Sequence, residues 1–167
     1  MDTQDHRIEE LRRAAFADPR NGEIRYLLGA ELAQQRRYDE AVLELSAAIA
    51  LKPLLHTARL QLGLLHLTMA QTHHPDAVLA PLEGLEDDSA LKHFKRGLDA
   101  LIVDDLPAAA VCLERGIELN RDNSALNNDM RMLVARINET IAANSAQVSD
   151  HPDGIRTDFS LYGTTRH

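Results

Sequence analysis

A glycine returns every 34 residues in this chain, and this interval restricts the folds that the chain can adopt. Gly29, Gly63 and Gly97 share it. A fixed period of this length is typical of proteins built from stacked supersecondary units rather than from one irregular core. Two sets of leucines repeat at the same interval, namely Leu45, Leu79 and Leu113, and Leu51, Leu85 and Leu119.

Each period has the pattern of two helices joined by a polar turn. In the first period, apolar residues recur at helical spacing over 24–35, and a second helix is predicted over 39–51. Pro53 ends this second helix, because proline lacks a hydrogen-bond donor and disfavours helical geometry in the residue before it. The sequence therefore predicts antiparallel helix pairs.

Small residues lie where the two helices of a pair would meet. Gly29 on the first helix, with Ala41 and Ala48 on the second, allows the two backbones to approach closely. Together with Pro53, these residues resemble the tetratricopeptide repeat, which has small residues at its eighth, twentieth and twenty-seventh places and proline at its thirty-second. The chain departs from the family pattern at the fourth place, where Arg25 replaces the usual tryptophan.

The resemblance implies an all-α superhelix of three repeats with a capping helix at each end. Pro81 falls inside the second helix of the middle repeat, which we expect to be kinked or shortened, because proline removes a helical hydrogen bond. Ser124 is the expected N-cap of the last helix. The predicted segments are an N-terminal cap (1–21), repeats at 22–55, 56–89 and 90–123, a C-terminal cap (124–143) and a flexible tail (144–167).

Charge and composition exclude several classes of partner. The chain has 18 Lys and Arg against 26 Asp and Glu, a formal net charge of −8, so nucleic acid and anionic membranes are not expected as partners. Its single cysteine cannot form an internal disulfide, and no segment approaches the roughly 18 apolar residues of a membrane helix. The first residues lack the apolar run of a secretory signal, and a cytoplasmic location is expected.

No motif indicates catalysis, a metal or a cofactor. His73 and His74 are adjacent in a turn, and no HExxH or CxxC spacing accompanies them. His66 is expected to be a packed core residue, and Cys112 a packed thiol. An active site would have to be assembled from scattered residues, so we predict a noncatalytic protein that needs no cofactor.

In the tetratricopeptide family the first helices of successive repeats line a concave groove, and the corresponding residues of this chain are mainly apolar. Because the opposite side of these helices is apolar too, either a ligand covers the groove or it is an exposed apolar patch of the kind that marks interaction sites. The alternative is that the residues belong to the core. The predicted groove residues are Tyr26, Ala30, Leu60, Gln61, Leu64, Leu67, Leu91, Phe94, Lys95, Leu98, Leu101 and Met132.

A charged peptide is not the expected ligand of this groove. Family members that hold the C-terminal carboxylates of heat-shock chaperones use lysine, asparagine and arginine at five places. Only Lys95 is a cation among the equivalent residues here, so the carboxylate clamp is absent and an apolar segment is expected instead. The five equivalent residues are Tyr26, Ala30, Gln61, Leu91 and Lys95.

The C-terminal tail contains one candidate ligand, the apolar cluster Phe159, Leu161 and Tyr162. A flexible linker over 144–159 spans about 21 Å, which is comparable to two stacked repeats. These residues are therefore predicted to reach the groove of their own chain or of a neighbouring copy, unless the tail makes no contact.

These features together predict a protein interaction module that acts as a scaffold or adaptor and binds an apolar peptide segment. Two alternatives remain open. Small acidic cytoplasmic proteins with three such repeats include chaperones of secretion translocators, which keep an apolar client soluble. A homo-oligomer with exchanged C-terminal tails is the other alternative.

Overall fold

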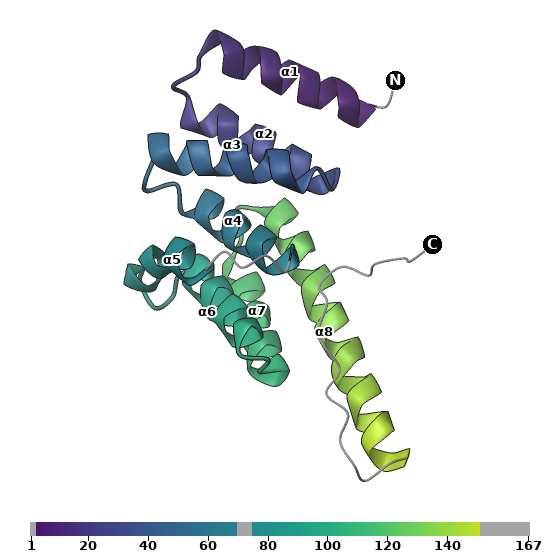
Figure 1. The fold of residues 1–167 in the computed structure, drawn as a ribbon. Coiled ribbons are helices and arrows are strands. Elements are labelled where there is room, and N and C mark those ends of the chain that lie inside the picture. Colours follow the sequence, from purple (N-terminus) through teal and green to yellow (C-terminus); the bar gives the residue numbers. More distant parts are fainter. Residues whose placement is uncertain (1–2, 70–74, 151–167) are drawn as a thin grey trace. The chain divides into compact units, whose positions relative to one another are not determined.

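The computed structural model describes residues 3–69 and 75–150, and within these ranges the chain forms helices and no strand (Figure 1). The predicted all-α class is therefore confirmed. The chain consists of two compact units, Met1–Leu79 and Ala80–His167.

Five helices make up the described part of the first unit, and each packs against the next. Asn21 caps the second of them, because its side-chain oxygen accepts hydrogen bonds from the N–H groups of Glu23 (3.1 Å) and Ile24 (3.2 Å). The helices are α1 (Thr3–Ala17), α2 (Gly22–Gln34), α3 (Tyr38–Leu51), α4 (His56–Thr68) and α5 (Pro75–Leu79).

The second unit begins with a 3-10 helix, η1, which packs against α6. Asp105 caps α7 by accepting a hydrogen bond from the N–H of Ala108 (3.1 Å), and α7 packs against both of its neighbours in sequence. The elements are η1 (Ala80–Gly84), α6 (Ala90–Ile102), α7 (Leu106–Leu119) and α8 (Ser124–Asp150).

Three helix pairs share one close contact, in which a glycine of the first helix faces a leucine of the second. A Cβ added to any of the three glycines would lie under 3 Å from the leucine side chain, so alanine would already be too large without local movement. The predicted close approach is confirmed at these positions. The pairs and the distances to leucine Cγ are Gly29 with Leu45 (2.8 Å), Gly63 with Leu79 (2.7 Å) and Gly97 with Leu113 (2.7 Å).

A second contact recurs at the start of α2, α4 and α6. In each helix, the side chain of the fourth residue of the 34-residue period reaches back to the backbone carbonyl six residues earlier, and so ties the helix to the linker that precedes it. The three contacts are Arg25 Nε with Pro19 O (3.2 Å), Arg59 Nε with Pro53 O (3.0 Å) and His93 Nε2 with Asp87 O (3.0 Å).

The turns after α2 and α6 have the same geometry. Arg36 and Asp104 adopt positive φ angles of 59° and 60°, the left-handed conformation that usually takes glycine. After α2, the N–H of Arg37 donates to the Leu32 carbonyl (2.9 Å), and after α6 the N–H of Asp105 donates to the Ala100 carbonyl (2.8 Å). Both helices therefore end in the Schellman arrangement, which satisfies their last carbonyl groups.

Pro81 interrupts the helical segment that begins at Pro75, as predicted. The α-helix α5 ends at Leu79, and the next five residues form η1. Pro75 is the first residue of α5, where its missing N–H has no helical partner to lose. Despite this break, Leu79 and Leu82 are fully buried.

The last helix differs from the prediction at both ends. Its N-cap is Asn123, whose side-chain oxygen accepts from the N–H of Leu126 (3.0 Å), and the predicted cap Ser124 is already helical. The helix also continues to Asp150, seven residues past the predicted boundary at 143. The sequence contains no glycine or proline between Asn123 and Pro152, so nothing in it stops the helix at 143.

Candidate functional site

The predicted groove residues of the first unit lie on α2 and α4, which are neighbouring helices. Ala30 on α2, together with Gln61, Leu64 and Leu67 on α4, is partly exposed, and we call these four residues the α2–α4 strip. Leu60 is fully buried, so its assignment to an open groove is wrong.

Tyr26, also predicted to line the groove, is partly buried and packs against the core of the first unit. Its ring therefore supports α2 from the interior side, and we do not include it in the α2–α4 strip.

The α2–α4 strip is exposed because α4 is apolar on two sides. Ala58, Leu62 and Leu65 lie in the core of the first unit, and Leu64 and Leu67 fall on another side of the same helix. Gln61 adds a polar group, since its Oε1 atom is buried and no donor among the described residues reaches it. The strip thus combines apolar side chains with an unused hydrogen-bond acceptor.

In the second unit, three of the predicted groove residues belong to the core instead. Phe94 and Leu98 on α6 are fully buried, and Leu101 is nearly so. Phe94 turns toward α7, where Gly116 leaves room for its ring: a Cβ on Gly116 would lie 2.5 Å from Phe94 Cε1. The prediction that these three residues line a groove is therefore wrong, and the core interpretation is correct for them.

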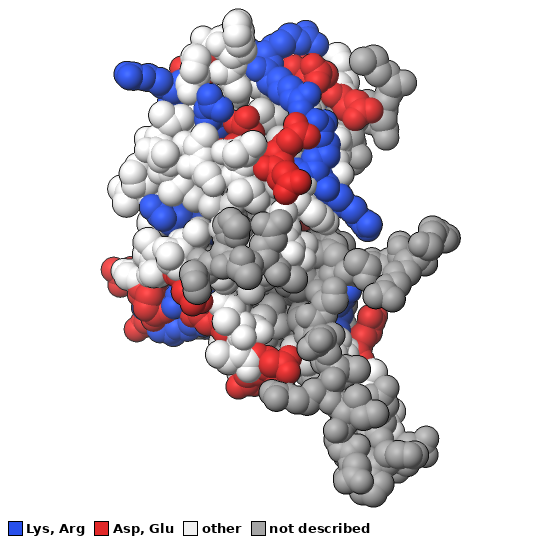
Figure 2. Space-filling model, viewed as in Figure 1, with Lys and Arg blue, Asp and Glu red and all other residues white. Residues whose placement is uncertain are grey.

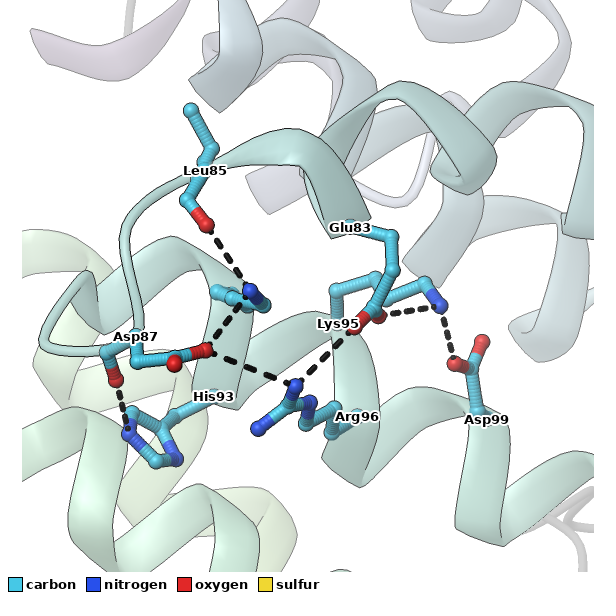
Figure 3. Close-up of polar contacts among 8 residues, drawn as sticks. Glu83, Leu85, Asp87, His93, Lys95, Arg96 and Asp99 are labelled. Atoms are coloured by element: carbon cyan, nitrogen blue, oxygen red, sulfur yellow. Dashed lines mark hydrogen bonds and ion pairs between the residues drawn. The ribbon is translucent and has the colours of Figure 1, made fainter.

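The remaining groove residues of this unit differ in what they offer a ligand. Leu91 on α6 is partly exposed, and Met132 on α8 is 62% exposed. Lys95 is engaged by two carboxylates, Glu83 (2.9 Å) and Asp99 (2.6 Å), as Figure 3 shows. Its charge is already neutralised within the unit, so it has little to offer a ligand carboxylate.

Glu83 and Lys95 belong to a larger ionic cluster that fastens the segment 83–87 to α6 (Figure 3). Glu83 accepts hydrogen bonds from Lys95 and Arg96 (3.0 Å), which lower the pKa of Glu83 to about 2. The side chain of Lys92 is only 10% exposed, and it donates to the Leu85 carbonyl and to Asp87, both at 2.8 Å. The hydrogen bond from Lys92 also lowers the pKa of Asp87. The cluster has a structural role, because each of these cations is paired.

We expect Glu83→Gln to make the protein less sensitive to acid. The lowered pKa of Glu83 means that its contribution to stability is complete above the ordinary value of 4.5 and is lost as the pH falls toward about 2. Because Glu83 is exposed, the contribution is below about 1 kcal/mol. In thermal unfolding, the melting temperature of the wild type should fall more between pH 6 and pH 3 than that of Glu83→Gln. Equal decreases would contradict a role for this carboxylate.

The described residues do not bring metal-binding groups together. Within 3–69 and 75–150, no three His, Cys, Asp or Glu side chains are placed to hold an ion. His66 is partly buried on α4, and Cys112 is partly buried on α7. His73 and His74 lie outside the described residues.

Two other predictions concern the tail and the membrane. Phe159, Leu161 and Tyr162 also lie outside the described residues. None of the helices described here combines the length and the apolar character that crossing a membrane would require.

Comparison with known proteins finds no family model that matches this chain, and no curated protein that matches it. The candidate site is accordingly argued from the geometry of the α2–α4 strip.

Proposed function

We propose that this chain is a noncatalytic interaction module of the tetratricopeptide type, which binds an apolar peptide segment on the α2–α4 strip. The observation that carries the proposal is the partial exposure of Leu64 and Leu67 on a helix whose opposite side is buried. Apolar side chains left open in this way gain free energy when a ligand covers them.

The recurring contacts support a repeat of this type. The glycine–leucine contact is found in α2 with α3, α4 with α5 and α6 with α7, always with the leucine 16 residues after the glycine. The bond from the fourth place to the preceding linker recurs as well, and at that place Arg25 and Arg59 stand where the family usually has tryptophan. We propose three repeats, at 22–55, 56–89 and 90–123, stacked as a superhelix.

The chemistry of the strip favours an uncharged segment in an extended conformation. Ala30, Leu64 and Leu67 offer apolar surface and carry no charge. The free Oε1 of Gln61 suits a backbone N–H, which every extended peptide presents at regular intervals. The tail cluster of Phe159, Leu161 and Tyr162 fits this description, and so does an apolar segment of a partner protein in the cytoplasm.

The proposal is tested with the tail sequence as the probe. The full chain with Phe159, Leu161 and Tyr162 replaced by alanine is titrated into a fluorescently labelled peptide of residues 155–167, and binding is followed by anisotropy. We expect saturable binding that becomes at least about tenfold weaker when Leu64 and Leu67 are both replaced by serine. Leu54→Ser is the matched control, because Leu54 is 81% exposed and lies outside the strip.

A partner protein is tested in parallel by affinity purification from cells. Proteins retained by the wild type and lost with Leu64→Ser and Leu67→Ser would support a groove for partner segments, provided that circular dichroism shows both proteins to be folded. If the peptide does not bind and the two proteins retain the same partners, the proposed site is wrong.

A further inference from the structure

Helix α3 has an exposed apolar side that the peptide site does not use. Ala41, Leu45 and Ala48 are fully buried on its inner side, whereas Leu43 is 70% exposed and Leu51 39% exposed. A helix that is apolar on both sides is normally covered on both sides. We call the exposed side the outer face of α3, and it consists of Leu43, Ser46, Ala47, Ala50 and Leu51.

The equivalent side of α7 shows what this face lacks. Helix α7 lies 68 residues, or two periods, after α3, and its residues Glu114, Arg115 and Glu118 are exposed. These charged residues occupy the places of Ser46, Ala47 and Ala50. Figure 2 shows a broad uncharged area over α3, with charged side chains gathered toward its N-terminal end. The outer face of α3 is therefore apolar at places where the same chain carries charges on α7.

The charges beside this face are already paired within the first unit. Glu44 accepts from Arg25 (2.8 Å), and Lys52 donates to Glu23 (2.6 Å). The face consequently has no excess charge, although the chain as a whole carries −8. A charged partner would gain little here, whereas a second copy of this chain brings an equally neutral face with the same paired charges at its edge.

The shape of the face suits pairing with itself. Leu43, Ala47 and Leu51 follow each other at intervals of four residues and form a ridge, and Ser46 and Ala50 form a shallow row beside it. Packing of such ridges into the grooves between them is the commonest arrangement of two helices. In a pair related by a twofold axis, the leucines of each copy would lie over the small residues of the other.

We infer that two copies of this chain associate through the outer faces of α3. A contact limited to one helix from each copy is smaller than the roughly 800 Å² per partner of a standard interface. The homodimer is therefore reversible, with a dissociation constant in the micromolar range. This contact is separate from the peptide site, and its failure would leave the proposed function intact.

The inference is tested by analytical ultracentrifugation of the full chain between roughly 5 and 500 µM, which spans micromolar affinities. The wild type should pass from monomer to dimer over this range. Replacing Ser46 and Ala50 together by glutamate should raise the dissociation constant at least about tenfold, because the new carboxylates would be buried without partners. The same two positions changed to lysine should have the same effect.

An equimolar mixture of the glutamate and lysine variants should form a heterodimer, since the opposite charges then face each other. This recovery separates a lost contact from a lost fold. Both variants are expected to fold, because α7 carries glutamate at the same two places. The control is Asn138→Glu with Ala142→Glu, which adds the same charges at the same spacing on exposed residues of α8 and should leave the dimer unchanged.

Three results would overturn the inference. One is a wild type that stays monomeric at the highest concentration, and another is a glutamate variant that dimerises as the wild type does. The third is a dimer that is lost when Phe159, Leu161 and Tyr162 are replaced by alanine, which would assign the association to the tail.

Discussion

Replacing Phe94 with alanine is expected to lower the free energy of unfolding by about 3–5 kcal/mol. Phe94 is fully buried, and its ring fills the space that Gly116 leaves between α6 and α7. Removing the ring loses its burial and leaves a cavity that the helix pair cannot close completely. Urea denaturation followed by circular dichroism measures the change.

The control for this substitution is Leu91→Ala, a truncation on the same helix at a partly exposed residue, which should lower the free energy of unfolding much less. This comparison also distinguishes the two roles considered for Phe94. If Phe94→Ala left stability unchanged but abolished binding of the tail peptide, the ring would belong to a ligand site.

Replacing Gly116 with valine should have the next largest effect, a loss of about 2–3 kcal/mol in the free energy of unfolding. A Cβ at this position would meet the rigid ring of Phe94 and lie 3.1 Å from the Ala90 carbonyl oxygen. Valine has a better helix propensity than glycine, but the gain is under about 1 kcal/mol and does not offset the overlap. The measurement is again urea denaturation.

Two comparisons make this second prediction specific. Gly84→Ala should be nearly neutral, because a Cβ there would meet no atom within 4 Å. The double variant Phe94→Ala with Gly116→Val should lose less stability than the sum of its single changes, since the valine occupies part of the cavity. Strict additivity of the two changes would show that the two positions are not in contact.

The sequence was a good guide to where helices begin and end. The second helix of the first pair was predicted over 39–51 and is observed over Tyr38–Leu51, because Pro53 stops it and the polar turn before it is short. The break at Pro81 followed from proline's missing donor. Local chemistry decides these features, and one chain contains enough information to place them.

The side that each helix turns inward was harder to predict. On α4 and α6 apolar residues surround most of the helix, so the pattern does not distinguish a core side from a ligand side. The predicted rotation was correct for Leu64 and Leu67, which are partly exposed, but not for Phe94. The position of Phe94 depends on the space at Gly116, 22 residues away on another helix.

Polar contacts to the backbone were missed for a different reason. Asn123 and Ser124 are both good capping residues, and only the path of the chain decides which of them caps α8. Likewise, Arg25 was regarded only as a departure from the family pattern, yet it bonds the carbonyl of Pro19. A carbonyl group is present in every residue, so no sequence pattern marks it as an acceptor.

The same fact gives the linkers before α2, α4 and α6 an evolutionary freedom. The acceptors are two prolines and one aspartate, and the donor at the start of each helix recognises only the course of the main chain. Substitutions in these linkers therefore leave the attachment intact, whereas inserting or deleting a residue would move the carbonyl out of reach. Selection in these loops is thus expected to act on length more strongly than on composition.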